Sequence, residues 1–130
     1  MATDIEVRQA LAESIDQIDG IRGHEFTPGQ VNPPAAIVIE MDVEFDASMQ
    51  RGSDRMIALV RLLTGGDMRS AQTRLSQMVA DVRARIWDDP TLGDVVSDCR
   101  LRRKRGDSEG QIDAYGATFA VVDVEVEIIT

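Results

Sequence analysis

The 130-residue chain is predicted to form a single α+β domain, residues 1–130, with two helices packed on one face of a mainly antiparallel sheet. Three observations predict this fold class. Two segments repeat apolar residues at helical spacing, and several others alternate apolar and polar residues as strands do. The order along the chain is helix, strands, helix, strands, which is typical of helices segregated to one face of an antiparallel sheet.

The first helix is expected to begin after Thr3 and to end before Gly20. Thr3 and Glu6 form a capping-box pattern, and acids in the first turn suit the helix dipole. Gly20 suits the left-handed position that often follows a last turn. The face expected to join the core carries Val7, Leu11, Ile15 and Ile18.

A short extended segment is expected over 21–26, followed by a stiff connector in which Pro33 and Pro34 remove two amide donors. The next segment, 37–45, alternates strictly and predicts a strand with an acidic face and an apolar face. We expect the apolar face to comprise Ile37, Ile39, Met41, Val43 and Phe45.

Beyond a connection at 47–53, a strand over 55–63 and a helix over 71–86 are expected, the helix capped by Asp67 and ending near Trp87. The remaining chain predicts two strands, 98–105 and 111–130. A glycine-containing turn at 106–110 is expected to join them.

Composition limits the function. The net charge of −9 argues against general nucleic-acid binding, which requires a clustered positive field. The single cysteine, Cys99, cannot form an intramolecular disulfide and is expected to be a buried thiol. The N-terminal residues lack a signal-peptide pattern, and no apolar stretch is long enough to span a membrane.

The sequence motifs predict no enzyme activity, no catalytic residue and no cofactor. The only histidine, His24, has no nucleophile motif near it, and the phosphate-binding glycine patterns are absent. Gly65 and Gly66 precede a helix, but Asp67 would repel an anion there. The alternating acids from Glu40 to Asp46 stand ~7 Å apart on a strand, too far apart to converge on a metal ion, so no metal site is expected.

The run from Arg100 to Arg105 holds five basic residues in an acidic chain. It could be a nucleic-acid patch, although no aromatic residue is interleaved, or a solvated hairpin arm. A turn near Ser108 would leave this arm without acidic cross-strand partners. The third interpretation is therefore a head-to-tail contact between copies, with Arg100, Arg102 and Lys104 at the interface between subunits.

Three segments in order, 5–12, 31–35 and 89–93, together with the strand-rich C-terminal end, resemble the tail terminator (tail completion) proteins of long-tailed phages of actinobacteria. The similarity covers nearly the whole chain. It implies a structural virion protein of the phage neck, assembled in the host cytoplasm. Such proteins form a ring, typically a hexamer, that stops tail-tube polymerisation and joins the tail to the head connector. The resemblance also implies no cofactor.

The expected partners are therefore copies of the same chain, the tail tube protein and the head-tail connector protein, with no membrane contact. Double-stranded DNA would pass through the ring without specific binding, and a negative lumen favours this. We expect a channel-facing set of acids, either Glu40, Asp42 and Glu44 or Asp123, Glu125 and Glu127. Contact with the tail tube is expected at Met49, Gln50 and Arg51, in a loop that could order on docking.

Two alternatives stay open. One is another neck component, such as a head-completion or stopper protein of similar size and symmetry. The other is a small non-viral binding domain, which would stay monomeric or dimeric and would be distinguished by light scattering.

Overall fold

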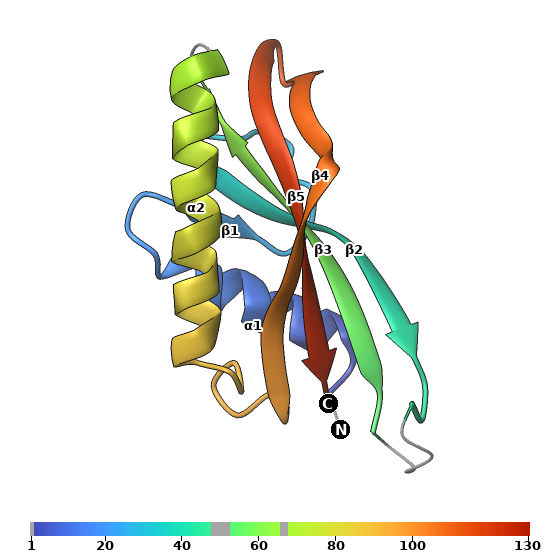
Figure 1. Ribbon diagram of the computed structural model, residues 1–130. Coiled ribbons are helices and arrows are strands. Elements are labelled where there is room, and N and C mark those ends of the chain that lie inside the picture. The colour runs from blue at the N-terminus through green and yellow to red at the C-terminus, as the bar shows by residue number, and fades with distance from the viewer. Residues whose placement is uncertain (1, 48–52, 66–67) are drawn as a thin grey trace.

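In a computed structural model, residues 2–47, 53–65 and 68–130 are described. Two helices lie on one face of a five-stranded sheet, which confirms the predicted α+β class (Figure 1). The strand order is β1-β2-β3-β5-β4; β1 and β2 are parallel, and the other neighbours are antiparallel. The elements are α1 (Asp4–Asp16), β1 (Arg22–His24), β2 (Ala35–Glu44), β3 (Arg55–Thr64), α2 (Met68–Asp88), β4 (Asp98–Ala114) and β5 (Ala117–Ile129).

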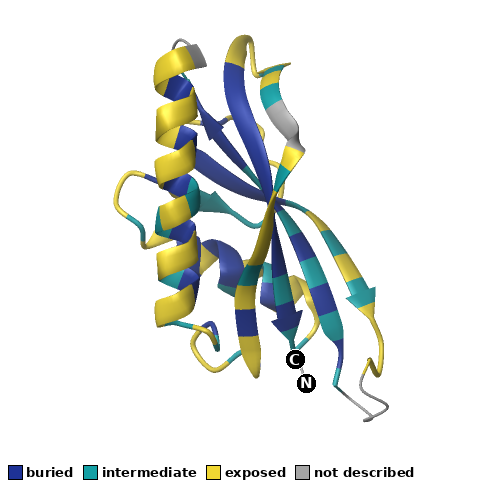
Figure 2. Cartoon of the chain, viewed as in Figure 1, coloured by how far each residue is buried: buried dark blue, intermediate teal, exposed yellow. Residues whose placement is uncertain are grey.

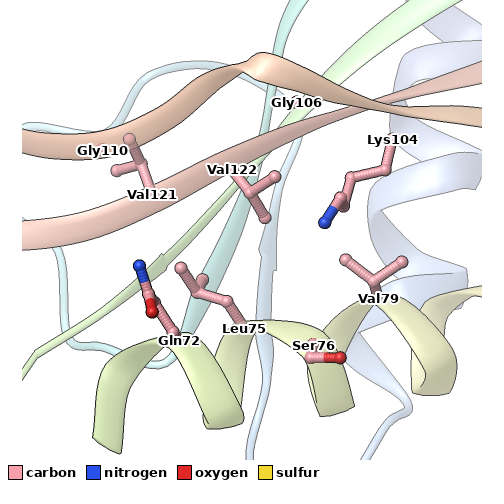
Figure 3. A pocket seen from close by; sticks show the side chains of 9 residues that line it. All are labelled: Gln72, Leu75, Ser76, Val79, Lys104, Gly106, Gly110, Val121 and Val122. Atoms are coloured by element: carbon pink, nitrogen blue, oxygen red, sulfur yellow. The ribbon is translucent and has the colours of Figure 1, made fainter. Parts of the chain in front are cut away.

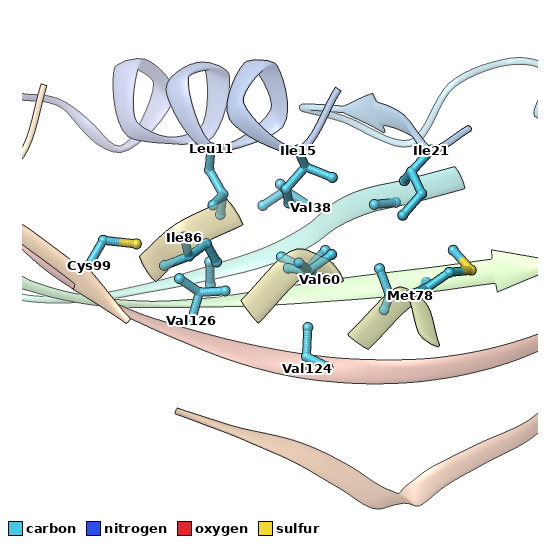
Figure 4. Close-up of a cluster of buried hydrophobic side chains, with 14 of the residues drawn as sticks. Leu11, Ile15, Ile21, Val38, Val60, Met78, Ile86, Cys99, Val124 and Val126 are labelled. Carbon is cyan, nitrogen blue, oxygen red and sulfur yellow. The ribbon is translucent and has the colours of Figure 1, made fainter. Parts of the chain in front are cut away.

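The main core fills the space between the helices and the sheet, where side chains from both layers interlock (Figure 4). Each strand of the β3–β5 pair contributes every second residue, as expected from the pleat. The fully buried side chains here include Leu11, Ile15, Val60, Val82, Ile86, Val124, Val126 and Ile128. This cluster is the predicted core, and it fixes both helices to one face.

The start of α1 follows the predicted cap, because Thr3 Oγ1 accepts a hydrogen bond from the Glu6 amide at 3.2 Å. The helix ends at Asp16, earlier than expected, and a turn leads to Gly20 at φ +83°. Arg85 of α2 then donates to the backbone and hydroxyl oxygens of buried Ser14, both at 3.1 Å. These bonds tie the end of α1 to the last turns of α2.

The prediction that all the alternate apolar residues of β2 lie on a single face is wrong. A β-bulge between Val38 and Glu40 adds one residue to the strand, so the alternation changes face at that point. Ile37 therefore lies on the face away from the helices, whereas Met41 and Val43 pack against the main core. Phe45, expected inside, lies past the strand end and is 75% exposed.

The position of the last turn also differs from the prediction. β4 continues through 106–110 with a register shift, and the hairpin turns at Tyr115 and Gly116. These residues have φ values of +54° and +75°, as a two-residue type I′ turn requires. The Tyr115 hydroxyl donates to the Pro28 carbonyl at 2.7 Å, so the hairpin end is held against the proline-containing connector.

A second, smaller apolar cluster lies on the sheet face opposite the helices. It occupies the half of the sheet near the hairpin end, and its buried members are Val31, Ala35, Ile37, Leu63, Phe119 and Val121. The other half of this face carries charged side chains. Figure 2 shows the contrast along β2, which is buried near β1 and mostly exposed or half-buried beyond it.

Candidate functional site

The sheet has two open edges in the part of the chain that the structure describes. β4 is the last strand on one side. On the other side, β1 pairs only with Ala35 to Ile37, so the remainder of β2 is also an edge. Open edges offer main-chain donors and acceptors to another chain. The side chains along the two edges therefore decide what could pair there.

The β2 edge is acidic. Glu40, Asp42 and Glu44, the first set of candidate channel-facing residues, are all exposed on the sheet face away from the helices. Glu44 pairs with Arg55 at 3.3 Å, and its own side chain stays 61% exposed. We call this segment the acidic edge.

The β4 edge is basic and carries the three candidate inter-subunit residues, all of them exposed: Arg100, Arg102 and Lys104. Arg100 pairs with Glu127 at 3.0 Å but remains 69% exposed. Lys104 points to the other face, into a pocket of about 420 Å³ between β4 and α2 (Figure 3). We call this segment the basic edge.

The expectation that the basic arm and the acidic end of β5 are unmatched within the hairpin is wrong. Because the hairpin turns at Tyr115–Gly116, β4 and β5 pair in a register that places arginines opposite acids. Arg103 pairs with Glu125, and Arg100 and Arg55 both pair with Glu127. The turn predicted near Ser108 would have displaced this register.

The second set of candidate channel-facing acids comprises Asp123, Glu125 and Glu127. Asp123 accepts two hydrogen bonds from Arg61, at 2.9 and 3.1 Å. Its side chain is only 4% exposed. The hydrogen bond to Asp123 raises the pKa of the Arg61 guanidinium. Asp123 is therefore a buried carboxylate of the sheet face that is paired with Arg61.

The carboxyls of Glu125 and Glu127 are also held in their charged form. The pKa of Glu125 is lowered mainly by its hydrogen bond from Arg103, and the pKa of Glu127 mainly by its hydrogen bond from Arg55. Of the two acidic sets, the acidic edge is thus the one that presents exposed carboxylates.

A feature that the sequence pattern did not predict lies beside the basic edge. Trp87, in the last turn of α2, is 81% exposed and borders a groove of about 480 Å³. The residues that line this Trp87 groove are Arg83, Ile86, Trp87, Pro90, Asp98, Cys99, Arg100 and Leu101. The available signal was an aromatic residue just outside the apolar repeat of the helix.

The other residues considered from the sequence are not brought together. His24 ends β1, and its Nε2 is buried without a hydrogen-bond partner among the described residues. Burial raises the pKa of the Cys99 thiol to about 12. Among the described residues, no three acidic, histidine or cysteine side chains could hold a metal ion. No helix in the described ranges is long and apolar enough to cross a membrane.

The residues expected to contact the tail tube, Met49, Gln50 and Arg51, lie outside the described residues, as do Gly66 and Asp67. Comparison with known proteins adds no assignment, because no protein-family model and no curated protein matches the chain.

Proposed function

We propose that the chain is a ring-forming subunit, the tail terminator of a long-tailed phage. In this role, copies join edge to edge into a ring, typically a hexamer, at the head-proximal end of the tail tube. The ring ends tube polymerisation and gives the head connector a surface to bind.

The observation that carries this proposal is the pair of open sheet edges of opposite charge. Glu40, Asp42 and Glu44 lie along one edge, and Arg100 and Arg102 along the other. An interface between unlike surfaces of identical chains is head-to-tail, and it closes into a ring when the rotation permits. Charge complementarity fixes the register of such a contact and speeds association.

The strand directions are compatible with this contact. β2 and β5 run the same way, because each is antiparallel to β3, and β4 runs opposite to both. A neighbour placed by rotation therefore brings its β2 antiparallel to β4. Main-chain hydrogen bonds could then continue the sheet from one subunit into the next.

The exposed acids also suit a channel for DNA. The face that the helices leave open would line the ring if the helices pack outside. On this face the acids of β5 are paired with arginines of β3 and β4, whereas the acidic edge adds exposed carboxylates. Carboxylates at the lumen repel phosphate over a screening length of ~8–10 Å. DNA could then pass without binding.

Purified tail tubes test the function. Tubes polymerised in the presence of the chain should be shorter, and electron microscopy should show added density at one tube end. Unchanged tube lengths and no bound density would contradict the proposal. Binding to portal-bearing heads instead of tubes would identify the alternative, a head-completion or stopper protein.

A further inference from the structure

Two exposed aromatic residues lie at the same end of the molecule but on opposite edges of the sheet. Phe45, one residue past β2, is 75% exposed, and Trp87, in the last turn of α2, is 81% exposed. Aromatic side chains are enriched at the centres of protein interfaces. Neither ring contributes to the main core, so both are available for a contact outside the chain.

The sheet register places Phe45 and the Trp87 groove at the two ends of the same row of residues across the strands. Glu44 is opposite Arg55, Arg55 is opposite Ile129, and Ile129 is opposite Asp98, so one row crosses four strands. Three strand spacings of ~4.8 Å separate its ends by roughly 14 Å. Phe45 follows the row at the acidic edge, and the Trp87 groove adjoins it at the basic edge.

Both features also lie on the helix side of the sheet. Phe45 borders a hollow formed with Val43, Met56 and residues 2–4, which lead into α1. The Trp87 groove lies between the end of α2 and the start of β4. In Figure 1 the end of β2, the start of β4 and the last turn of α2 lie at the same end of the molecule.

The charges around the two features are complementary. Two arginines, Arg83 and Arg100, line the Trp87 groove together with one acid, Asp98. Phe45 stands between the exposed acids Glu44 and Asp46. An apolar ring between two carboxylates therefore matches an apolar groove bordered by two exposed arginines, of which Arg100 is also paired with Glu127.

We propose that the Trp87 groove receives Phe45 from the neighbouring copy in the ring. Each subunit gives its Phe45 to one neighbour and accepts Phe45 from the other, because the two features occupy opposite edges. This assignment rests on the proposed ring and names the contact that would hold it together. Glu44 and Asp46 of the incoming segment would face Arg83 and Arg100.

Cysteine cross-linking tests the contact directly. Because the free thiol of Cys99 lines the Trp87 groove, Phe45→Cys and Arg83→Cys are each prepared in a Cys99→Ala background, mixed in equal amounts and oxidised. A disulfide-linked dimer is expected in the mixture and in neither protein alone. The matched control replaces Arg83→Cys by Arg69→Cys, also exposed on α2 but 14 residues, roughly 21 Å, away.

Association measurements give a second readout. Phe45→Ala and Trp87→Ala should each weaken subunit association at least tenfold, and the double variant should lose less than the product of both effects. Phe26→Ala, at another exposed aromatic residue, is the control. Because both target rings are exposed, circular dichroism should show that the variants fold.

The outcomes separate the two proposals. A wild-type ring with no cross-link in the mixture and unchanged association of Trp87→Ala would overturn the contact and leave the ring standing. A wild-type protein that never forms a ring would overturn both.

Discussion

At the scale of single residues, the most informative group is the Arg61–Asp123 pair. Asp123 lies on a sheet face that no helix covers, yet its side chain is only 4% exposed. A buried carboxylate is tolerated only when its oxygens are paired. Both of its oxygens accept hydrogen bonds from Arg61, so the pair is part of the folded sheet.

Arg61→Met should lower the free energy of unfolding by about 1–3 kcal/mol, because it removes both hydrogen bonds that Arg61 donates to the buried Asp123 carboxylate. Urea denaturation at pH 7 measures the change, with Arg22→Met at an exposed arginine of β1 as the control. Adding Asp123→Leu to Arg61→Met should restore part of the loss. Equal stability of wild type and Arg61→Met would contradict this role.

The paired carboxyls of Glu125 and Glu127 predict a dependence of stability on acid pH. Their pKa values in the folded chain lie below the ordinary 4.5, because arginines donate hydrogen bonds to the charged forms. The stabilisation is therefore complete above pH 4.5 and is lost as the pH falls through the lowered folded values.

Urea denaturation at several pH values below 4.5 should show this loss in the wild type and a shallower loss in the Glu125→Gln variant. Glu13→Gln, an exposed glutamate of α1, is the control for removing one surface carboxylate. An unfolding free energy that does not change with pH in this range would exclude the proposed stabilisation by these pairs.

At the scale of elements, β1 depends on a close approach to α1. A Cβ at Gly23 would lie 2.2 Å from the Ala12 carbonyl oxygen and 3.0 Å from the Asp16 amide nitrogen. Both are backbone atoms of the helix, so they cannot move aside as a flexible side chain would. The Gly23 amide also donates to the Asp16 carboxylate at 2.9 Å.

Gly23→Ala should destabilise the fold by about 1–3 kcal/mol through this overlap. Gly29→Ala is the matched control, because a Cβ there meets no atom within 4 Å. Thermal unfolding of both variants compares the two positions. A Gly23→Ala variant as stable as Gly29→Ala would show that β1 can move away from α1 without cost.

The same scale explains which parts of the fold could be predicted from the sequence. The helices were found because Thr3, the apolar repeat of α2 and the end near Trp87 are local signals. The β2 bulge and the turn at Tyr115–Gly116 were missed, because each depends on pairing with a strand distant in sequence. Tyrosine also seldom adopts positive φ, so the turn carried no strong local signal.

The position of this turn determines which charged residues of β4 and β5 lie opposite each other. A turn near Ser108 separates the arginines of β4 from the acids of β5, whereas the observed turn pairs Arg100 with Glu127 and Arg103 with Glu125. The second acidic set was therefore predicted to be free and proved to be paired. The exposure of Trp87 depends on how α2 lies over β4, which periodicity alone does not define.

At the scale of the whole molecule, both sides of the sheet end in a strand edge that pairs with no further strand in the described residues. Proteins usually protect open edges with charge, and here the two edges carry opposite charge. Such edges repel copies of themselves and attract one another. The arrangement therefore favours head-to-tail assembly over a symmetric pair of like edges.

Electron microscopy of the purified protein at low ionic strength tests whether the subunits assemble head to tail into a ring. Averaged images should show one closed particle with rotational symmetry and a central channel. The particles should be lost when Arg100 and Arg102 are both replaced by glutamate. A population that contains only monomers or two-fold dimers, at every concentration and salt condition, would exclude head-to-tail ring assembly.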